Sequence, residues 1–144
     1  MTTDFAIYLL ASGGALLLVD QWSKRLVQVR LADRCVSWGP ILRIRCVSNV
    51  KEMFRRDGAR ALLVLVWLTA FLSAMALYRS GAWFQGRAAL FGLGLAFGGA
   101  AGNLLDILRR GHIVDFVDLR WWPVFNLADV AIVGGLLTAL WPRI

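Results

Sequence analysis

The sequence predicts an all-α membrane protein with four transmembrane helices, a small β-hairpin or sheet outside the membrane and a juxtamembrane helix. Two observations lead to this expectation. The 144-residue chain is 59% hydrophobic with a mean hydropathy of +0.65, which is too apolar for an ordinary soluble domain. Long apolar segments also alternate with shorter polar ones. We therefore expect a single integral-membrane domain over residues 1–144.

The four predicted spans cover about residues 5–20, 61–78, 88–106 and 124–141. The first is short for a hydrocarbon core of about 30 Å, so we expect its helix to gain length at both ends. Its start, MTTDF, lacks the positive charge of a cleaved signal peptide, which favours a retained span. Residues 25–58, between the first two spans, are expected to lie outside the membrane.

Within this extramembrane region, the segment CVSWGPILRIRCVS has the pattern of a β-hairpin. Residues from Leu42 to Cys46 alternate between apolar and polar, and the WGP tripeptide interrupts the alternation. A turn just after Pro40 would place Cys35 opposite Cys46, where a disulfide could form. Two free thiols are the alternative, because a slip of one residue faces the side chains apart. With two cysteines and one histidine, we expect no metal site.

The basic charge points to a membrane surface. The net charge is +7, and ten of the sixteen Lys and Arg residues lie between the first two spans, interleaved with tryptophan and apolar residues. This arrangement suits anionic headgroups, so we expect membrane phospholipid and no nucleic acid as a partner. Thirteen of the cationic residues lie in the two loops next to the aspartates described below. The positive-inside rule alone would place those loops in the cytoplasm.

Acidic residues in or beside apolar spans are costly and usually functional. Asp115 precedes a tryptophan-rich turn, and Asp129 follows Asn126 by three residues, on nearly the same helix face. If the fold brings the two carboxyls together, one keeps its proton while the other can take a proton from water, as in aspartic proteases. In the alternative reading, Asp115 caps a helix and Asp129 is a buried, hydrogen-bonded carboxyl. Four aspartates lie near the ends of spans: Asp106, Asp115, Asp118 and Asp129.

The third span combines a polar end with small residues. Asn103 and Asp106 share one helix face, where their side chains could orient the aspartates or a scissile amide. Glycines at four-residue spacing before them predict close approach of another helix backbone. A glycine pair in the last span predicts tight packing there as well. The glycines are Gly94, Gly98 and Gly102 in the third span and Gly134 and Gly135 in the last.

Four motifs resemble, in order and approximate spacing, those of the lipoprotein signal peptidases, the signal peptidase II family. Their combination is specific and extends over nearly the whole chain. The resemblance implies a monomeric bacterial aspartic endopeptidase without a cofactor. Its dyad, Asp115 and Asp129, would activate water to remove signal peptides from diacylglyceryl-modified precursors. The motifs are DQWSK with Asp20 and Lys24, GNLLD with Asn103 and Asp106, VDF with Asp115, and FNLAD with Asn126 and Asp129.

The resemblance also implies a place and an orientation. The protein would lie in the bacterial inner membrane, with its termini in the cytoplasm and its active site toward the periplasm, opposite to the charge pattern. We follow the resemblance, because many charges lie in the middle of a loop of about 40 residues, where the positive-inside rule is weak. Asp20 and Lys24, an i,i+4 pair, would support the site, and the hairpin would belong to a small periplasmic sheet that cradles substrate.

Two departures from the family pattern bear on the substrate. Between Asn49 and Phe54, which the family shares and which would contact substrate, this chain has Lys-Glu-Met in place of glycine and small residues. The position after Asp106 is isoleucine where the family has arginine. Arg109 or Arg110 could supply the missing guanidinium to a lipid phosphate or a substrate carbonyl. Alternatively, both arginines snorkel at a helix end.

These departures leave other functions open. The chain could be a paralogue with another membrane substrate, or a protein that binds lipidated or signal peptides without cutting them. The paired aspartates together with Asn103 and Asn126 argue against a binder, which has no evident need for carboxylates in lipid. An ion or proton carrier would need polar residues through the middle of the spans, and the sequence has almost none.

Overall fold

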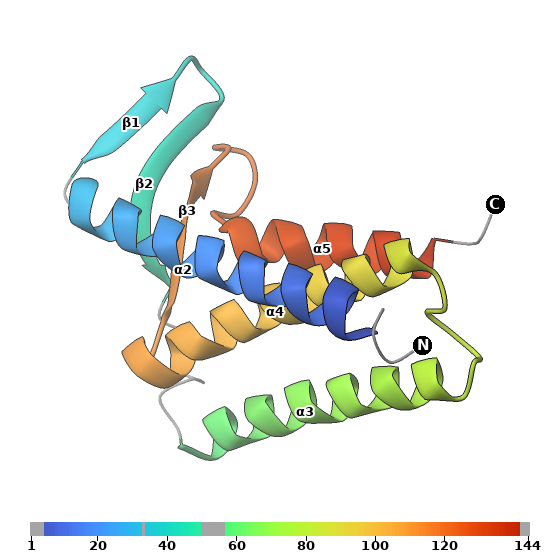
Figure 1. The fold of residues 1–144 in the computed structure, drawn as a ribbon. Helices are drawn as coiled ribbons and strands as arrows, with labels where there is room; N and C mark the ends of the chain where they lie inside the picture. The colour runs from blue at the N-terminus through green and yellow to red at the C-terminus, as the bar shows by residue number, and fades with distance from the viewer. Residues whose placement is uncertain (1–4, 33, 50–56, 142–144) are drawn as a thin grey trace.

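The computed structural model describes residues 5–32, 34–49 and 57–141 as helices beside a small antiparallel sheet (Figure 1). The strands lie at one end of the helices, and the connection between α3 and α4 lies at the other. The elements in chain order are a π-helix η1 (Phe5–Ala11), α2 (Ser12–Arg30), β1 (Cys35–Trp38), β2 (Leu42–Asn49), α3 (Asp57–Arg79), α4 (Arg87–Arg110), β3 (Ile113–Asp118) and α5 (Leu127–Leu140).

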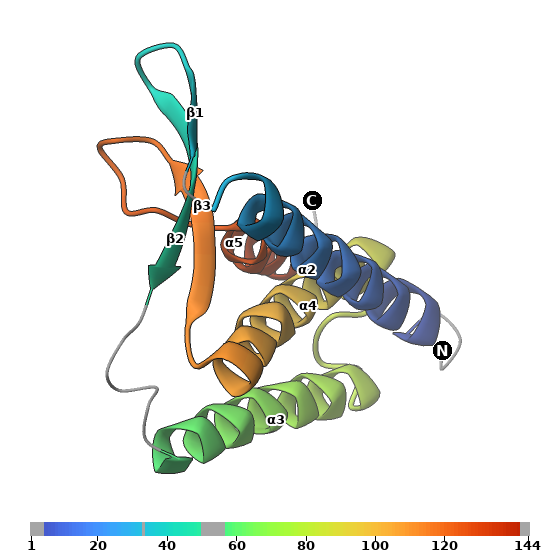
Figure 2. The same cartoon turned by 90° about the vertical axis from the view of Figure 1, so that its left-hand side faces the viewer.

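Helix α4 is the centre of the bundle. It packs against η1 and α2 on one side and against α5 on another, while α3 packs mainly against α4 and stands apart from the other helices (Figure 2). The predicted glycine stripe explains the approach of α2. A Cβ atom on Gly98 would lie 2.4 Å from the main-chain oxygen of Gly13, and one on Gly102 would lie 2.5 Å from Oδ2 of Asp20. The prediction that another helix backbone approaches this stripe is confirmed.

The glycine pair of α5 divides into one packed and one open position. A Cβ on Gly135 would lie 2.5 Å from the oxygen of Gly92, whereas a Cβ on Gly134 would meet nothing within 4 Å. The prediction of tight packing is therefore wrong for Gly134, because successive residues of a helix point about 100° apart.

We expect Gly135→Ala to destabilise the protein by about 1–3 kcal/mol, because the added methyl group overlaps main-chain atoms of α4. Thermal unfolding in detergent measures the effect. Gly134→Ala is the matched control, and it should be neutral or slightly stabilising, because alanine favours helix over glycine by about 1 kcal/mol. Equal stability of the two variants would contradict the packing described here.

The helices differ in extent from the predicted spans. Helix α2 continues to Arg30 instead of ending at Asp20, and residues 21–30 contain neither glycine nor proline to stop it. Helix α4 continues to Arg110 and ends at Gly111, whose φ is +75°. Helix α5 begins only at Leu127, because Asn126 caps it.

Two described helices, Gly58–Arg79 and Arg87–Arg110, are long and apolar enough to cross a membrane. Helix α5 is apolar but has only 14 residues, and α2 contains Asp20 and Lys24 among its buried residues. The mostly helical fold with a small sheet agrees with the predicted class. Four membrane spans and their orientation remain predictions.

The predicted hairpin is present, and it belongs to a sheet of order β1-β2-β3. The register differs by one residue from the prediction, because Cys35 pairs with Arg45 and not with Cys46. The turn is centred on Pro40, after Gly39 with φ of +67°. Neighbouring residues of a strand face opposite sides, so the two cysteines do not oppose each other. Both are free, which agrees with the alternative of two free thiols and not with a disulfide.

The third strand was not predicted. The segment IVDFVD alternates partly between apolar and acidic residues, and this is the signal that could have revealed β3. It pairs antiparallel with β2, with Asp115 beside Val47. Asp115 therefore lies on a strand, and the alternative in which it caps a helix is wrong.

Candidate active site

A buried lysine forms the deepest part of the polar site. Lys24 is fully buried in α2, and its Nζ lies 2.8 Å from Oδ2 of Asp20 and 2.9 Å from Oδ2 of Asp106. Nζ also donates to Oδ1 of Asn103 at 2.9 Å. Both carboxylates are fully buried as well. The i,i+4 pair that the resemblance implies as a support of the site is thus one edge of an internal cluster that joins α2 to α4.

Further donors complete this cluster. Arg110 pairs with Oδ1 of Asp106 from one helical turn further along α4. Gln21 donates to the same oxygen at 3.1 Å and to the main-chain oxygen of Gly102 at 3.2 Å. The sequence reasoning missed Gln21, although its place beside Asp20 in DQWSK was a signal. Because every partner is hydrogen-bonded, the buried charges are compensated.

Two asparagines connect the cluster to the predicted dyad. Nδ2 of Asn103 donates to Oδ1 of Asp129 at 2.8 Å, and Nδ2 of Asn126 donates to Oδ1 of Asp115 at 2.8 Å. The asparagines also bond to each other, with Nδ2 of Asn126 3.0 Å from Oδ1 of Asn103. Asp115 and Asp129 thus lie at the two ends of one short hydrogen-bonded chain. The structure brings together all four residues that the sequence singled out here.

Local structure explains why α5 presents Asp129 at its start. Asn126 is the N-cap, and its Oδ1 accepts from the main-chain nitrogen of Asp129 at 3.0 Å. In return, Oδ2 of Asp129 accepts from the main-chain nitrogen of Asn126 at 3.1 Å. This capping box satisfies orphan donors of the first turn, and it leaves the Asp129 carboxyl half-buried. Asp115, by contrast, is only 4% exposed.

An apolar cavity of about 460 Å³ lies beside this network, between α3, α4 and α5. Its lining is aliphatic and aromatic apart from Asn103 and the indole nitrogen of Trp67, which donates to the main-chain oxygen of Phe97 at 3.3 Å. Ile107 belongs to this lining and is 4% exposed. Where the family pattern has an arginine, this chain therefore has a buried apolar wall. The cavity can hold an apolar chain that ends at Asn103.

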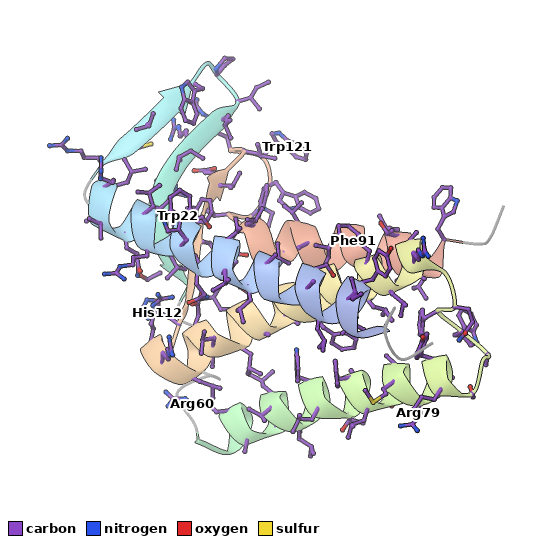
Figure 3. The ribbon with its side chains drawn as sticks, viewed as in Figure 1. Trp22, Arg60, Arg79, Phe91, His112 and Trp121 are labelled. Carbon is purple, nitrogen blue, oxygen red and sulfur yellow. The ribbon has the colours of Figure 1, made fainter. Side chains whose placement is uncertain are left out.

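The remaining predicted site residues have different positions. Asn49 is the last residue of β2, where its main chain pairs with Ile113, and Phe54 lies outside the described residues. Arg109 is exposed at the end of α4, and Arg110 turns inward to Asp106, so the two arginines are not equivalent. His112, which was not a predicted site residue, contacts the main-chain oxygen of Arg110 through Nδ1 at 3.0 Å and lies just after the C-terminal end of α4 (Figure 3).

Asp118, the fourth aspartate near a span end, belongs to the sheet and not to the network. The main-chain nitrogen of Arg120 donates to its carboxylate at 2.8 Å, and Nε of Arg45 donates at 2.6 Å. These two donors hold the pKa of Asp118 below its usual value. The ion pair between Asp118 and Arg45 holds the end of β3 against β2.

A family model described as signal peptidase (SPase) II matches residues 13–143. The chain belongs to the signal peptidase II family. A member from Halothermothrix orenii, a lipoprotein signal peptidase, is 34% identical over 132 residues, which cover 88% of this chain and 90% of that protein. The predicted resemblance is confirmed.

A second relative agrees with the family, and a solved structure agrees with the fold. The lipoprotein signal peptidase of Moorella thermoacetica is 63% identical over 49 residues, which span 34% of this chain and 33% of that protein. The fold is similar to that of a bacterial membrane enzyme solved at 1.9 Å by the in meso method, with a TM-score of 0.76 and 20% identity over 94% of this chain and 93% of the other.

Proposed function

We propose that this chain is an intramembrane aspartic endopeptidase that removes signal peptides from diacylglyceryl-modified precursor lipoproteins. The observation that carries the proposal is the hydrogen-bonded chain from Asp115 through Asn126 and Asn103 to Asp129 at the end of an apolar cavity. Paired carboxylates supply a general base and a general acid. The apolar cavity accommodates the lipid or hydrophobic part of the substrate.

The carboxyls of Asp115 and Asp129 together hold one proton in the resting site. The ionised member takes a proton from water, and the resulting hydroxide forms a bond to the scissile carbonyl carbon. The protonated member donates a hydrogen bond to the oxygen on which negative charge develops. The carbon–nitrogen bond then breaks, and the leaving nitrogen takes a proton from one of the two carboxyls, so that the dyad again holds one proton. Donation from Asn126 and Asn103 orients the two carboxyls throughout.

The same family assignment supports a proposal for the location of the protein. We place the protein as a monomer in the bacterial inner membrane, with the dyad toward the periplasmic face and phospholipid around α3 and α5. Exposed tryptophans support an interfacial position for the end of the molecule that carries the sheet: Trp22 on α2 and Trp121 in the loop after β3 are 64% and 72% exposed and lie at this end (Figure 3).

Cleavage of a purified diacylglyceryl-modified precursor by the protein in detergent tests the proposal. We expect release of the signal peptide by the wild type, and no cleavage of the same precursor without the diacylglyceryl group. If folded protein releases no peptide from any lipidated precursor, the peptidase proposal fails. Binding without cleavage in that assay would indicate the non-cutting binder or a paralogue with another membrane substrate.

A further inference from the structure

The buried lysine cluster touches the main chain at two positions that flank the dyad. Oδ1 of Asp20 accepts from the main-chain nitrogen of Ala128 at 3.1 Å, and Oδ2 of Asp106 accepts from that of Val114 at 3.4 Å. Ala128 is the residue directly before Asp129, and Val114 is the residue directly before Asp115. Each buried carboxylate thus holds the backbone next to one member of the dyad.

Lys24 bridges these two carboxylates. Its Nζ lies within 2.9 Å of Oδ2 of both Asp20 and Asp106. Without this shared cation, two buried carboxylates would repel each other and separate. The cluster consequently ties the start of α5 to the strand β3. It adds to the main-chain hydrogen bonds that join Phe125 to Phe116 and Val117, and to the bond that Nδ2 of Asn126 donates to the main-chain oxygen of Val114 at 3.3 Å.

We propose that Lys24, Asp20 and Asp106 are positioning residues that set the separation of Asp115 and Asp129, through the main-chain amides of Val114 and Ala128. The proposal rests on the dyad assigned under the proposed function. It differs from a general stabilising role, because it assigns each carboxylate to one catalytic residue. Asp20 positions Asp129, and Asp106 positions Asp115.

Arg110 is the partly exposed member of the cluster. The guanidinium holds Oδ1 of Asp106, while Oδ2 remains on Lys24 and on the amide of Val114. Its side chain is 26% exposed, so water reaches the outer end of an otherwise buried network. With Ile107 in the apolar wall of the cavity, Arg110 provides the guanidinium one turn later, and it acts on the carboxylate that holds β3.

The first test compares Asp20→Ala with Asp20→Asn. Alanine removes the acceptor for the amide of Ala128, whereas asparagine keeps an oxygen there. For Asp20→Ala we expect hydrogen exchange at Ala128 to be faster than in the wild type, with a smaller change at Val114. We also expect a kcat lower by about 10- to 100-fold with KM within about twofold, because small misplacements of reacting groups cost this much. Asp20→Asn should recover part of both effects. A folded Asp20→Ala protein with wild-type kcat, or no recovery by asparagine, would overturn the proposal.

The second test uses Arg110→Gln, which changes a partly exposed side chain and should fold even where Asp20→Ala does not. We expect faster exchange at Val114, unchanged exchange at Ala128, and a kcat lower by about 10-fold with unchanged KM. Arg79→Gln is the control, since Arg79 is also an arginine in the last turn of an apolar helix but lies at the opposite end of α3 from the site (Figure 3).

The inference would be overturned if exchange at Val114 is no faster in Arg110→Gln than in the wild type. It would also be overturned if Arg79→Gln speeds exchange at Val114 as much as Arg110→Gln does. The two proposals can fail separately. A wild-type protein that cuts no precursor refutes the proposed function. The exchange of Val114 and Ala128 in the variants is measured without substrate, and it still decides whether the cluster positions the backbone beside each aspartate.

Discussion

Replacing either Asp115 or Asp129 by asparagine is expected to lower the rate of precursor cleavage by at least about 10³-fold, because each change removes a proton donor or acceptor from the dyad. Asparagine keeps the shape of the side chain. Its carbonyl oxygen can still accept from Asn126 or from Asn103, as the carboxylates do at 2.8 Å. Initial rates with a purified, lipidated precursor measure the loss, and thermal unfolding shows that the fold is kept.

Asp118→Asn provides the matched control for this experiment. Asp118 lies on the same strand three residues after Asp115 and pairs with Arg45 outside the asparagine network. Its replacement should leave most of the cleavage rate, although the end of β3 loses an ion pair. A cleavage rate above one tenth of wild type (about 10-fold loss or less) in either dyad variant would refute the assignment of Asp115 and Asp129.

Replacing Lys24 by methionine should be the most destabilising single change at the site. Methionine fills a similar volume but leaves Asp20 and Asp106 buried without their cation. Removal of one partner from a buried ion pair costs about 3–5 kcal/mol, and here one cation serves two carboxylates. We expect a large fall in the unfolding midpoint in detergent, together with loss of cleavage.

Arg25→Met is the control for the lysine variant, because Arg25 is the next residue of α2 and is exposed. It should change stability by no more than about 0.5 kcal/mol, as is usual for surface substitutions. Adding Asp20→Asn to Lys24→Met should recover part of the stability, since it removes one uncompensated charge. If Lys24→Met unfolds at the same midpoint as Arg25→Met, the cluster contributes no net stability.

Much of the site could be predicted from short-range sequence patterns. Asp115, Asp129, Asn103 and Asn126 were singled out because carboxylates and amides in apolar surroundings are costly, and the structure connects all four. The glycine stripe of α4 was predictable for a similar reason, since small residues at four-residue spacing lie on one helix face. Both inferences need only the chain itself and the period of a helix.

Other features depended on small differences that the sequence does not encode locally. The hairpin turn is centred half a residue from the predicted position, and this shift alone separates Cys35 from Cys46. The strand β3 is short and is stabilised by pairing with β2, a long-range partner. The start of α5, by contrast, was encoded locally, because Asn126 and Asp129 form an N-terminal capping signature that places it correctly.

Composition and motif order by themselves determined that this chain is a mostly helical protein of the signal peptidase II family, and they predicted which two aspartates form the dyad. Only the tertiary structure decided what the pair Asp20 and Lys24 does. An i,i+4 spacing describes equally well a solvated pair on a helix surface and a buried bridge. The difference is made by Asp106 and Asn103, about 80 residues away in the chain (Lys24 to Asn103 is 79), because the worth of a charge depends on its neighbours in space.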